Sequence, residues 1–230
     1  MTKNTLKKIF PVATVMLTVA LCCAVMAVVE TVLELPYFAK SAVKAALFLL
    51  CPIIFFCVRR DGTPKAWFRA EKKHLLMSLA AGTVLYGLIL GAYFLLRGVI
   101  DFSAVTARLA ESDGVTRDNF PFVALYISVV NSLLEEFFFR GFAFLTLRRL
   151  SHPWLAHGFS AVAFAIYHIA ILDGWFTAPV LVLAIAGLAA AGIFFNAIDA
   201  KGGSLYPSWI IHLSANLAIN TIGFILFAAV

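Results

Sequence analysis

Seven long apolar stretches divide the chain of 230 residues, and they constrain its fold more than any other feature. Each approaches or exceeds the roughly 20 residues that an α-helix needs to cross the hydrocarbon core of a bilayer. The sequence therefore predicts an all-α fold, a polytopic transmembrane helix bundle of seven to eight spans that forms one domain over residues 1–230. The stretches are 11–29, 42–58, 75–96, 120–147, 154–172, 179–198 and 205–229.

The composition supports the same fold class. Apolar residues make up 63% of the chain and charged residues 13%, whereas a soluble domain has about 45–50% and about 25%. These values exclude a soluble domain, a disordered chain and a basic nucleic-acid-binding domain. The expected surroundings are the lipid bilayer, and no nucleic-acid partner is expected.

The basic residues between the stretches predict the orientation. Twelve fall on one side: Lys3, Lys7, Lys8, Arg59, Arg60, Lys65, Arg69, Lys72, Lys73, Arg148, Arg149 and Lys201. Five fall on the other side: Lys40, Lys44, Arg97, Arg108 and Arg117. Because loops rich in Lys and Arg stay in the cytoplasm, we expect a multi-pass protein with a cytoplasmic amino terminus.

Three charged residues lie inside the fourth stretch, where each costs at least about 2.5–3.5 kcal/mol. Glu136 and Arg140 are four residues apart, so they share a helix face and can pair. Glu135 points about 100° away, on the face of Asn131. One carboxylate can thus be neutralised within its own helix, while Glu135 is free to face a site.

Two further stretches carry polar groups at similar depth. At about 1.5 Å per residue from the predicted cytoplasmic ends, Glu135 lies about 20 Å deep and His168 about 21 Å. By the same rise, Asn216 lies about 18 Å deep and His212 about 12 Å. Three helices therefore bring Glu, His, His and Asn to overlapping depths, and these groups bind a divalent metal or activate a water.

The motifs of other membrane hydrolases are missing. The chain has no HExxH and no GxSxG, and neither Asp173 nor Asp199 lies deep in a stretch. The residue set therefore favours hydrolysis by a water that a glutamate activates, with or without a metal. A divalent metal such as zinc, if bound, would be held by Glu135, His168, His212 and Asn216.

Three motifs on separate stretches resemble those of the CAAX protease and bacteriocin-processing (CPBP, or Abi) family of intramembrane proteases. The resemblance covers roughly residues 120–220, which we expect to be the catalytic core region. The motifs are Glu135-Glu136-Phe137-Phe138-Phe139-Arg140, Phe164 to His168, and His212 to Asn216. The run Gly203-Ser204-Leu205-Tyr206-Pro207 also resembles the family's approach to its last motif.

The resemblance implies roles for these residues. Glu135 would be the general base for the attacking water, with His168 as its partner. His212 and Asn216 would stabilise the oxyanion or hold a metal, and Glu136 and Arg140 would be a supporting pair. The resemblance thus implies an intramembrane endopeptidase, metal-assisted or metal-free, that acts on a membrane-associated peptide or protein. The family's usual eight helices become seven in this sequence.

Two other functions fit the same residues. A non-catalytic bacteriocin-immunity or peptide-binding membrane protein would use the polar cluster only to hold a peptide. A small transporter would use Glu135, His168 and His212 as a proton relay. The transporter predicts inverted repeats, and the sequence shows none.

Overall fold

The computed structural model describes residues 3–33, 35–111 and 113–228. Over this part of the chain, seven helices are long and apolar enough to cross a membrane, and no strand is present. The predicted all-α transmembrane bundle is confirmed. The helices are α1 (Lys3–Thr31), α2 (Tyr37–Arg59), α4 (Lys72–Leu96), a central run (Phe120–Leu150), α9 (Pro153–Ile171), α10 (Ala178–Gly202) and α11 (Tyr206–Ala228).

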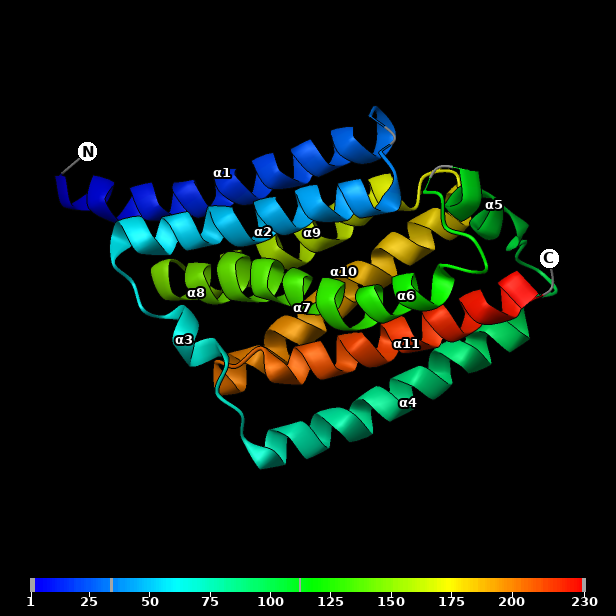
Figure 1. The fold of residues 1–230 in the computed structure, drawn as a ribbon. Coiled ribbons are helices and arrows are strands. Elements are labelled where there is room, and N and C mark those ends of the chain that lie inside the picture. Colours follow the sequence, from blue (N-terminus) through cyan, green and yellow to red (C-terminus); the bar gives the residue numbers. More distant parts are fainter. Residues whose placement is uncertain (1–2, 34, 112, 229–230) are drawn as a thin grey trace.

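The helices alternate in direction, so the connecting segments gather at two opposite ends (Figure 1). The first end holds the start of α1, the short helix α3 (Pro64–Trp67), the end of the central run and the turn between α10 and α11. The second end holds the short helix α5 (Ser103–Glu111) and the end of α11. The twelve basic residues of the predicted cytoplasmic side belong to the first end, which we call the basic end.

An ion pair links two connecting segments at the basic end. Arg149 lies in the last turn of the central run and pairs with Asp61, which also accepts a 3.0 Å hydrogen bond from the backbone N–H of Thr63. The hydrogen bond from the Arg149 guanidinium lowers the pKa of the Asp61 carboxyl from 3.8 to about 2. The loop after α2 is thereby held against the end of the central run.

The central run is continuous but not uniformly wound. It comprises α6 (Phe120–Leu125), a π-helical segment η1 (Tyr126–Asn131), α7 (Ser132–Glu135), a second π-helical segment η2 (Glu136–Leu145) and α8 (Thr146–Leu150). Wide π-helical turns inside a helix are frequent at functional sites. Here both carboxylates of the fourth stretch lie where α7 meets η2.

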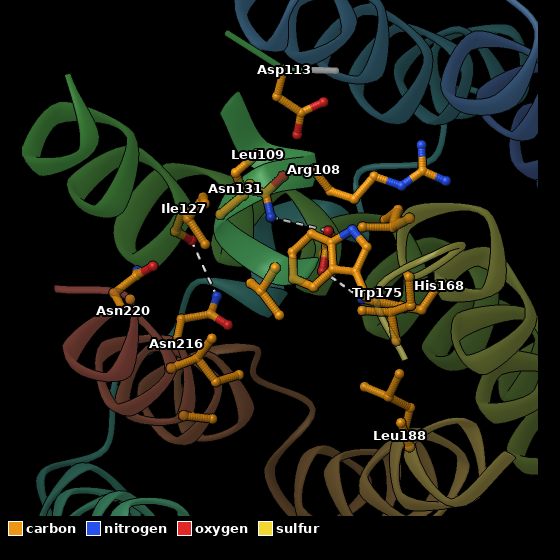
Figure 2. A pocket seen from close by; sticks show the side chains of 18 of the residues that line it. Arg108, Leu109, Asp113, Ile127, Asn131, His168, Trp175, Leu188, Asn216 and Asn220 are labelled. Carbon is orange, nitrogen blue, oxygen red and sulfur yellow. Dashed lines mark hydrogen bonds and ion pairs between the residues drawn. The ribbon is translucent and has the colours of Figure 1, made fainter. Parts of the chain in front are cut away.

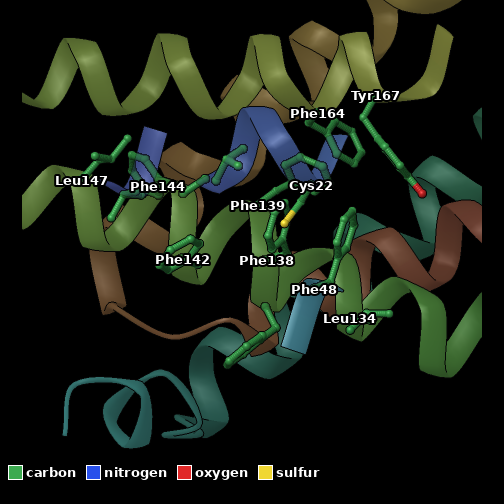
Figure 3. Close-up of a cluster of buried hydrophobic side chains, with 14 of the residues drawn as sticks. Cys22, Phe48, Leu134, Phe138, Phe139, Phe142, Phe144, Leu147, Phe164 and Tyr167 are labelled. Carbon is green, nitrogen blue, oxygen red and sulfur yellow. The ribbon is translucent and has the colours of Figure 1, made fainter. Parts of the chain in front are cut away.

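Phenylalanine side chains of this run and of its neighbouring helices form a large part of the main hydrophobic core (Figure 3). Phe138 and Phe139 are fully buried, and the ring of Phe48 from α2 stacks on Phe138 with centroids 3.9 Å apart. The central run has 61% of its most apolar window buried, against 11–33% in the other spans. The charges of the central run therefore lie inside protein rather than against lipid.

Helix α2 begins earlier than the sequence predicted. The second stretch was expected to start at residue 42, but α2 starts at Tyr37. The helix therefore contains Lys40 as well as Lys44, which the predicted stretch 42–58 already included. The half-buried Lys44 is tolerated within the span because it contacts polar groups of the central run.

Candidate active site

Each carboxylate oxygen of Glu136, the first residue of η2, contacts one side chain. Its side chain is fully buried, and its Oε2 lies 3.3 Å from Nε of Arg140, the pair expected from the four-residue spacing. Its Oε1 lies 2.8 Å from Nδ1 of His212 on α11. Glu136 therefore joins the central run to α11 and orients the imidazole ring of His212.

The Arg140 guanidinium lies between two aromatic rings. Its Cζ is 4.1 Å from the ring centroid of Phe164 on α9 and 5.0 Å from that of Phe195 on α10. The side chain is fully buried, and its nitrogens have no hydrogen-bond partner. Stacking and the ion pair to Glu136 compensate the buried charge, so Arg140 fixes three helices around the site.

Glu135 also has a cation, but from a different helix. Its Oε1 accepts a 3.0 Å hydrogen bond from Nδ2 of Asn131, one turn earlier in the central run. Nζ of Lys44 lies 3.3 Å from the same oxygen and donates a 2.9 Å hydrogen bond to Oδ1 of Asn131. Glu135 is only 2% exposed. The carboxylate is thus held in one orientation, with its second oxygen directed elsewhere.

Two histidines face that second oxygen. Nε2 of His168 lies 4.0 Å from Oε2 of Glu135, and Nε2 of His212 lies 3.8 Å from it. The Nδ1 atom of His168 is 2.7 Å from the backbone oxygen of Phe164, which can only accept, so Nδ1 carries the proton. In the neutral form of the ring, the unprotonated nitrogen is therefore Nε2, which faces the space beside Glu135.

Asn216 is close to this group but is not part of it. Its Nδ2 donates a 3.2 Å hydrogen bond to the backbone oxygen of Ile127 (Figure 2). Ile127 precedes Glu135 by eight residues in the central run. The side chain lines the same cavity as His168 and His212. The structure therefore brings together Glu135, His168 and His212, and leaves Asn216 at the wall beside them.

A cavity of about 750 Å³ begins at this cluster. Its inner end is formed by Glu135, His168 and His212, and its walls are mostly apolar side chains of α4, α10 and α11. Figure 2 shows the polar residues at its other end, among them Arg108 and Asp113. The volume lies within the range of ligand-binding pockets, so a peptide segment can be accommodated next to Glu135.

The geometry of the cluster does not fit a tetrahedral zinc ion. Ligand atoms at normal zinc distances stand about 3.4 Å apart, whereas the two histidine nitrogens stand 3.8 Å and 4.0 Å from Oε2 of Glu135. Within residues 3–33, 35–111 and 113–228, no group of three His, Cys, Asp or Glu side chains could hold a metal ion. We therefore derive no chemical step through a metal.

The sequence did not reveal the contacts of two charged residues near the site. Lys44 was read only as a charge within the short second stretch, although its spacing four residues after Lys40 on an apolar helix was a usable signal. Asp199, near the end of α10, was expected to be shallow. It is fully buried and accepts a 2.7 Å hydrogen bond from the hydroxyl of Ser208 at the start of α11.

The seven helices define a multi-pass membrane protein, and its buried cluster brings one carboxylate and two imidazole rings to the same cavity. Residues 117–218 match the protein family described as type II CAAX prenyl endopeptidase Rce1-like, a family of proteases. The resemblance seen in the three motifs is confirmed over this segment, which contains all six candidate site residues. Neither the curated proteins nor the solved structures include a match to the chain.

Proposed function

We propose that the protein is an intramembrane endopeptidase that hydrolyses a peptide bond of a membrane-associated substrate. The observation that carries this proposal is the orientation of Glu135. Its Oε2 faces the Nε2 atoms of His168 and His212 at the inner end of a peptide-sized cavity. The match of this segment to a protease family supports the same function.

The proposed first step is attack by water. A separation of 4.0 Å between Oε2 of Glu135 and Nε2 of His168 allows one water to hydrogen-bond to both atoms at about 2.8 Å. Glu135 takes one proton from this water as the water oxygen bonds to the carbonyl carbon of the substrate. The proton then passes to the amide nitrogen as the carbon–nitrogen bond breaks, which releases a free amine and a carboxylic acid that keeps the second proton of the water.

The oxyanion formed in that step needs hydrogen-bond donors. We propose His212 as the main donor, because the Glu136 carboxylate at its Nδ1 holds the ring with its Nε2 facing the site. Asn216 has a second N–H beside the one bonded to Ile127 and is the proposed auxiliary donor. Arg140 acts only through Glu136, as a positioning residue.

Replacing Glu135 by Gln tests the proposal. The variant keeps the hydrogen-bonding shape of the side chain but removes the base, so peptide cleavage should fall by about 10²–10⁴-fold. Glu71→Gln is the matched control, because Glu71 is an exposed carboxylate at the basic end, before α4. The assay uses purified protein in detergent, a quenched fluorogenic library of apolar peptides, and mass spectrometry of the products.

The outcomes separate the alternatives. Full activity of Glu135→Gln would refute the catalytic role of Glu135. Peptides that bind equally to both proteins and are never cleaved would favour a non-catalytic immunity or peptide-binding protein. Measurement of bound metal, with cleavage assayed before and after a chelator, decides between the metal-free and the metal-assisted scheme. The cytoplasmic position of the amino terminus remains a prediction from the basic residues.

A further inference from the structure

Asp199 is a buried carboxylate that the proposed mechanism does not use. It lies near the end of α10, at the basic end of the bundle, and its fully buried side chain does not line the cavity (Figure 1). Its Oδ2 accepts the 2.7 Å hydrogen bond from the hydroxyl of Ser208, and its Oδ1 accepts a 3.3 Å hydrogen bond from the backbone N–H of the same residue. Asp199 therefore holds the first turn of α11 with both of its oxygens.

These bonds complete the hydrogen bonding at the start of α11. The first N–H groups of a helix have no partner within the helix, so they need one elsewhere when they are buried. The N–H of Tyr206 bonds to the hydroxyl oxygen of Ser204 at 3.3 Å, and Pro207 has no N–H. The next N–H is that of Ser208, and Asp199 is its acceptor. A carboxylate is also favoured beside the positive end of a helix dipole.

The residue that Asp199 holds lies one turn before His212. Ser208 and His212 are four residues apart, so they share one face of α11 and lie about 6 Å apart along its axis. The Nδ1 atom of His212 is in turn 2.8 Å from the Glu136 carboxylate. Helix α11 is thus attached to α10 at Ser208 and to the central run at His212. Two attachments one turn apart fix the rotation and the depth of the helix at this point, and with them the direction of Nε2 of His212.

The charges of Glu136 and Arg140 lie in the same buried region. Both interact with Asp199, and the Ser208 side chain also interacts with Glu136. Within the described part of the chain, Oε2 of Glu136 receives no hydrogen bond. A buried donor that loses its acceptor carries the full cost of its desolvation unless it finds another one. Loss of the Asp199 contacts would therefore leave the Ser208 hydroxyl free to turn toward Glu136, the carboxylate that orients His212.

We propose that Asp199 is a positioning residue for His212 and that it acts through Ser208. Its effect on catalysis rests on the proposed function, whereas its effect on the direction of the imidazole ring does not. Because neither Asp199 nor Ser208 lines the cavity, loss of their contact should lower kcat and leave KM unchanged. Displacement of a reacting group by about 1 Å can reduce the rate about 10²-fold.

Two substitutions of Asp199 separate its hydrogen bonds from its charge. Asp199→Leu removes both acceptors, whereas Asp199→Asn keeps an amide oxygen for the N–H of Ser208. Asn196→Leu is the matched control, because Asn196 is also a fully buried polar residue of α10. Its side chain bonds to Ser160 and to the backbone oxygen of His157, both on α9, and not to α11.

Two readouts are measured on the purified full-length protein. The first is the pair of kcat and KM for cleavage of the fluorogenic peptides, with thermal unfolding as the measure of stability. The second needs no activity: diethyl pyrocarbonate modifies neutral imidazole rings, and mass spectrometry gives the ratio of modified His212 to modified His168. His168 is the internal reference, because its Nδ1 bonds to the backbone of its own helix.

Asp199→Leu is expected to lower kcat about 10–100-fold at unchanged KM and to change the labelling ratio at least about threefold. Asp199→Asn should stay within about threefold of the unaltered protein in kcat and keep its labelling ratio, because an amide oxygen still holds α11. Asn196→Leu should lower the stability and leave kcat and the labelling ratio unchanged. If Asp199→Leu does not fold, Ser208→Ala replaces it, with Ser208→Thr as the conservative partner that keeps the hydroxyl.

Three results would overturn the proposal: an unchanged kcat and labelling ratio in Asp199→Leu, equal losses in the two Asp199 variants, or an equal loss of kcat in Asn196→Leu. The proposed function fails separately. If the unaltered protein cleaves no peptide while Asp199→Leu still changes the labelling ratio, the proposed function is refuted and the positioning of His212 by Asp199 stands.

Discussion

Lys44 pairs with Glu135, and among the described residues it is the only Lys or Arg that does so. Replacing Lys44 by Met removes this partner. The two charges lie 3.3 Å apart, with 11% and 3% of their side chains exposed. At an effective dielectric constant of about 20, their attraction is about 5 kcal/mol before the cost of desolvation. Removing one partner of a buried pair costs about 3–5 kcal/mol, so Lys44→Met should lower the unfolding free energy by that amount.

A double-mutant cycle isolates the contribution of the pair. The unfolding free energies of the unaltered protein, Lys44→Met, Glu135→Gln and the double variant are measured by denaturant titration in mixed micelles. Because each single variant leaves a buried group without its partner, the double variant should be more stable than the sum of the single effects predicts, by about 2–3 kcal/mol. Lys40→Met is the matched control, since Lys40 pairs with Glu30 and Asp113 instead.

Additivity would refute the reasoning. If the Lys44 and Glu135 substitutions add to within about 0.5 kcal/mol, as independent sites do, the two groups do not interact in the folded protein. A coupling of equal size between Lys40 and Glu135 would show that the effect is a general response of α2. A specific coupling would place Lys44 among the groups that hold the Glu135 carboxylate in position.

Two further predictions concern the cavity wall and the basic end. Gly187 lines the cavity and a Cβ there meets no atom within 4 Å, so Gly187→Leu should obstruct the cavity and reduce kcat/KM by at least about tenfold at unchanged stability. Gly91→Leu is the control, because Gly91 has the same free space but does not line the cavity. Equal activities of the two variants would contradict binding of the substrate in the cavity. Since the pKa of Asp61 falls from 3.8 to about 2 on folding, the pair with Arg149 stabilises the protein above about pH 4, and this stabilisation is lost as pH falls toward 2. Thermal unfolding of Asp61→Asn against pH should therefore approach that of the unaltered protein at the acid limit, and parallel profiles would contradict the pair.

The parts of the site that lie on one helix were predictable from spacing. Glu136 and Arg140, and likewise Asn131 and Glu135, are four residues apart, and the structure contains both contacts. The approach of His168 to Glu135 was predictable only as a similar depth, because depth says nothing about the rotation of one helix against another. The same uncertainty explains Asn216, which was expected at a similar depth but donates to a backbone oxygen of the central run.

Contacts between distant helices were the ones that sequence reasoning missed. Lys44 looked like a charge at the edge of a short, weak span, and only the position of α2 against the central run brings it to Glu135. Asp199 lies near a helix end, where depth suggests exposure, but the adjoining turn folds back and buries it with Ser208. Such burial depends on tertiary packing, and the hydrophobic periodicity of a single helix does not predict it.

Helix α9 has 19 residues, so it extends only about 28 Å, slightly less than the hydrocarbon thickness of a typical bilayer. Neighbouring α10 has 25 residues and can match thicker membranes by tilting. A short helix matches the lipid by thinning the bilayer around itself, and His168 lies only three residues before the carboxyl-terminal end of α9. Acyl-chain length therefore sets how far His168 lies from the lipid headgroups, and hydrophobic mismatch acts directly on a residue of the site.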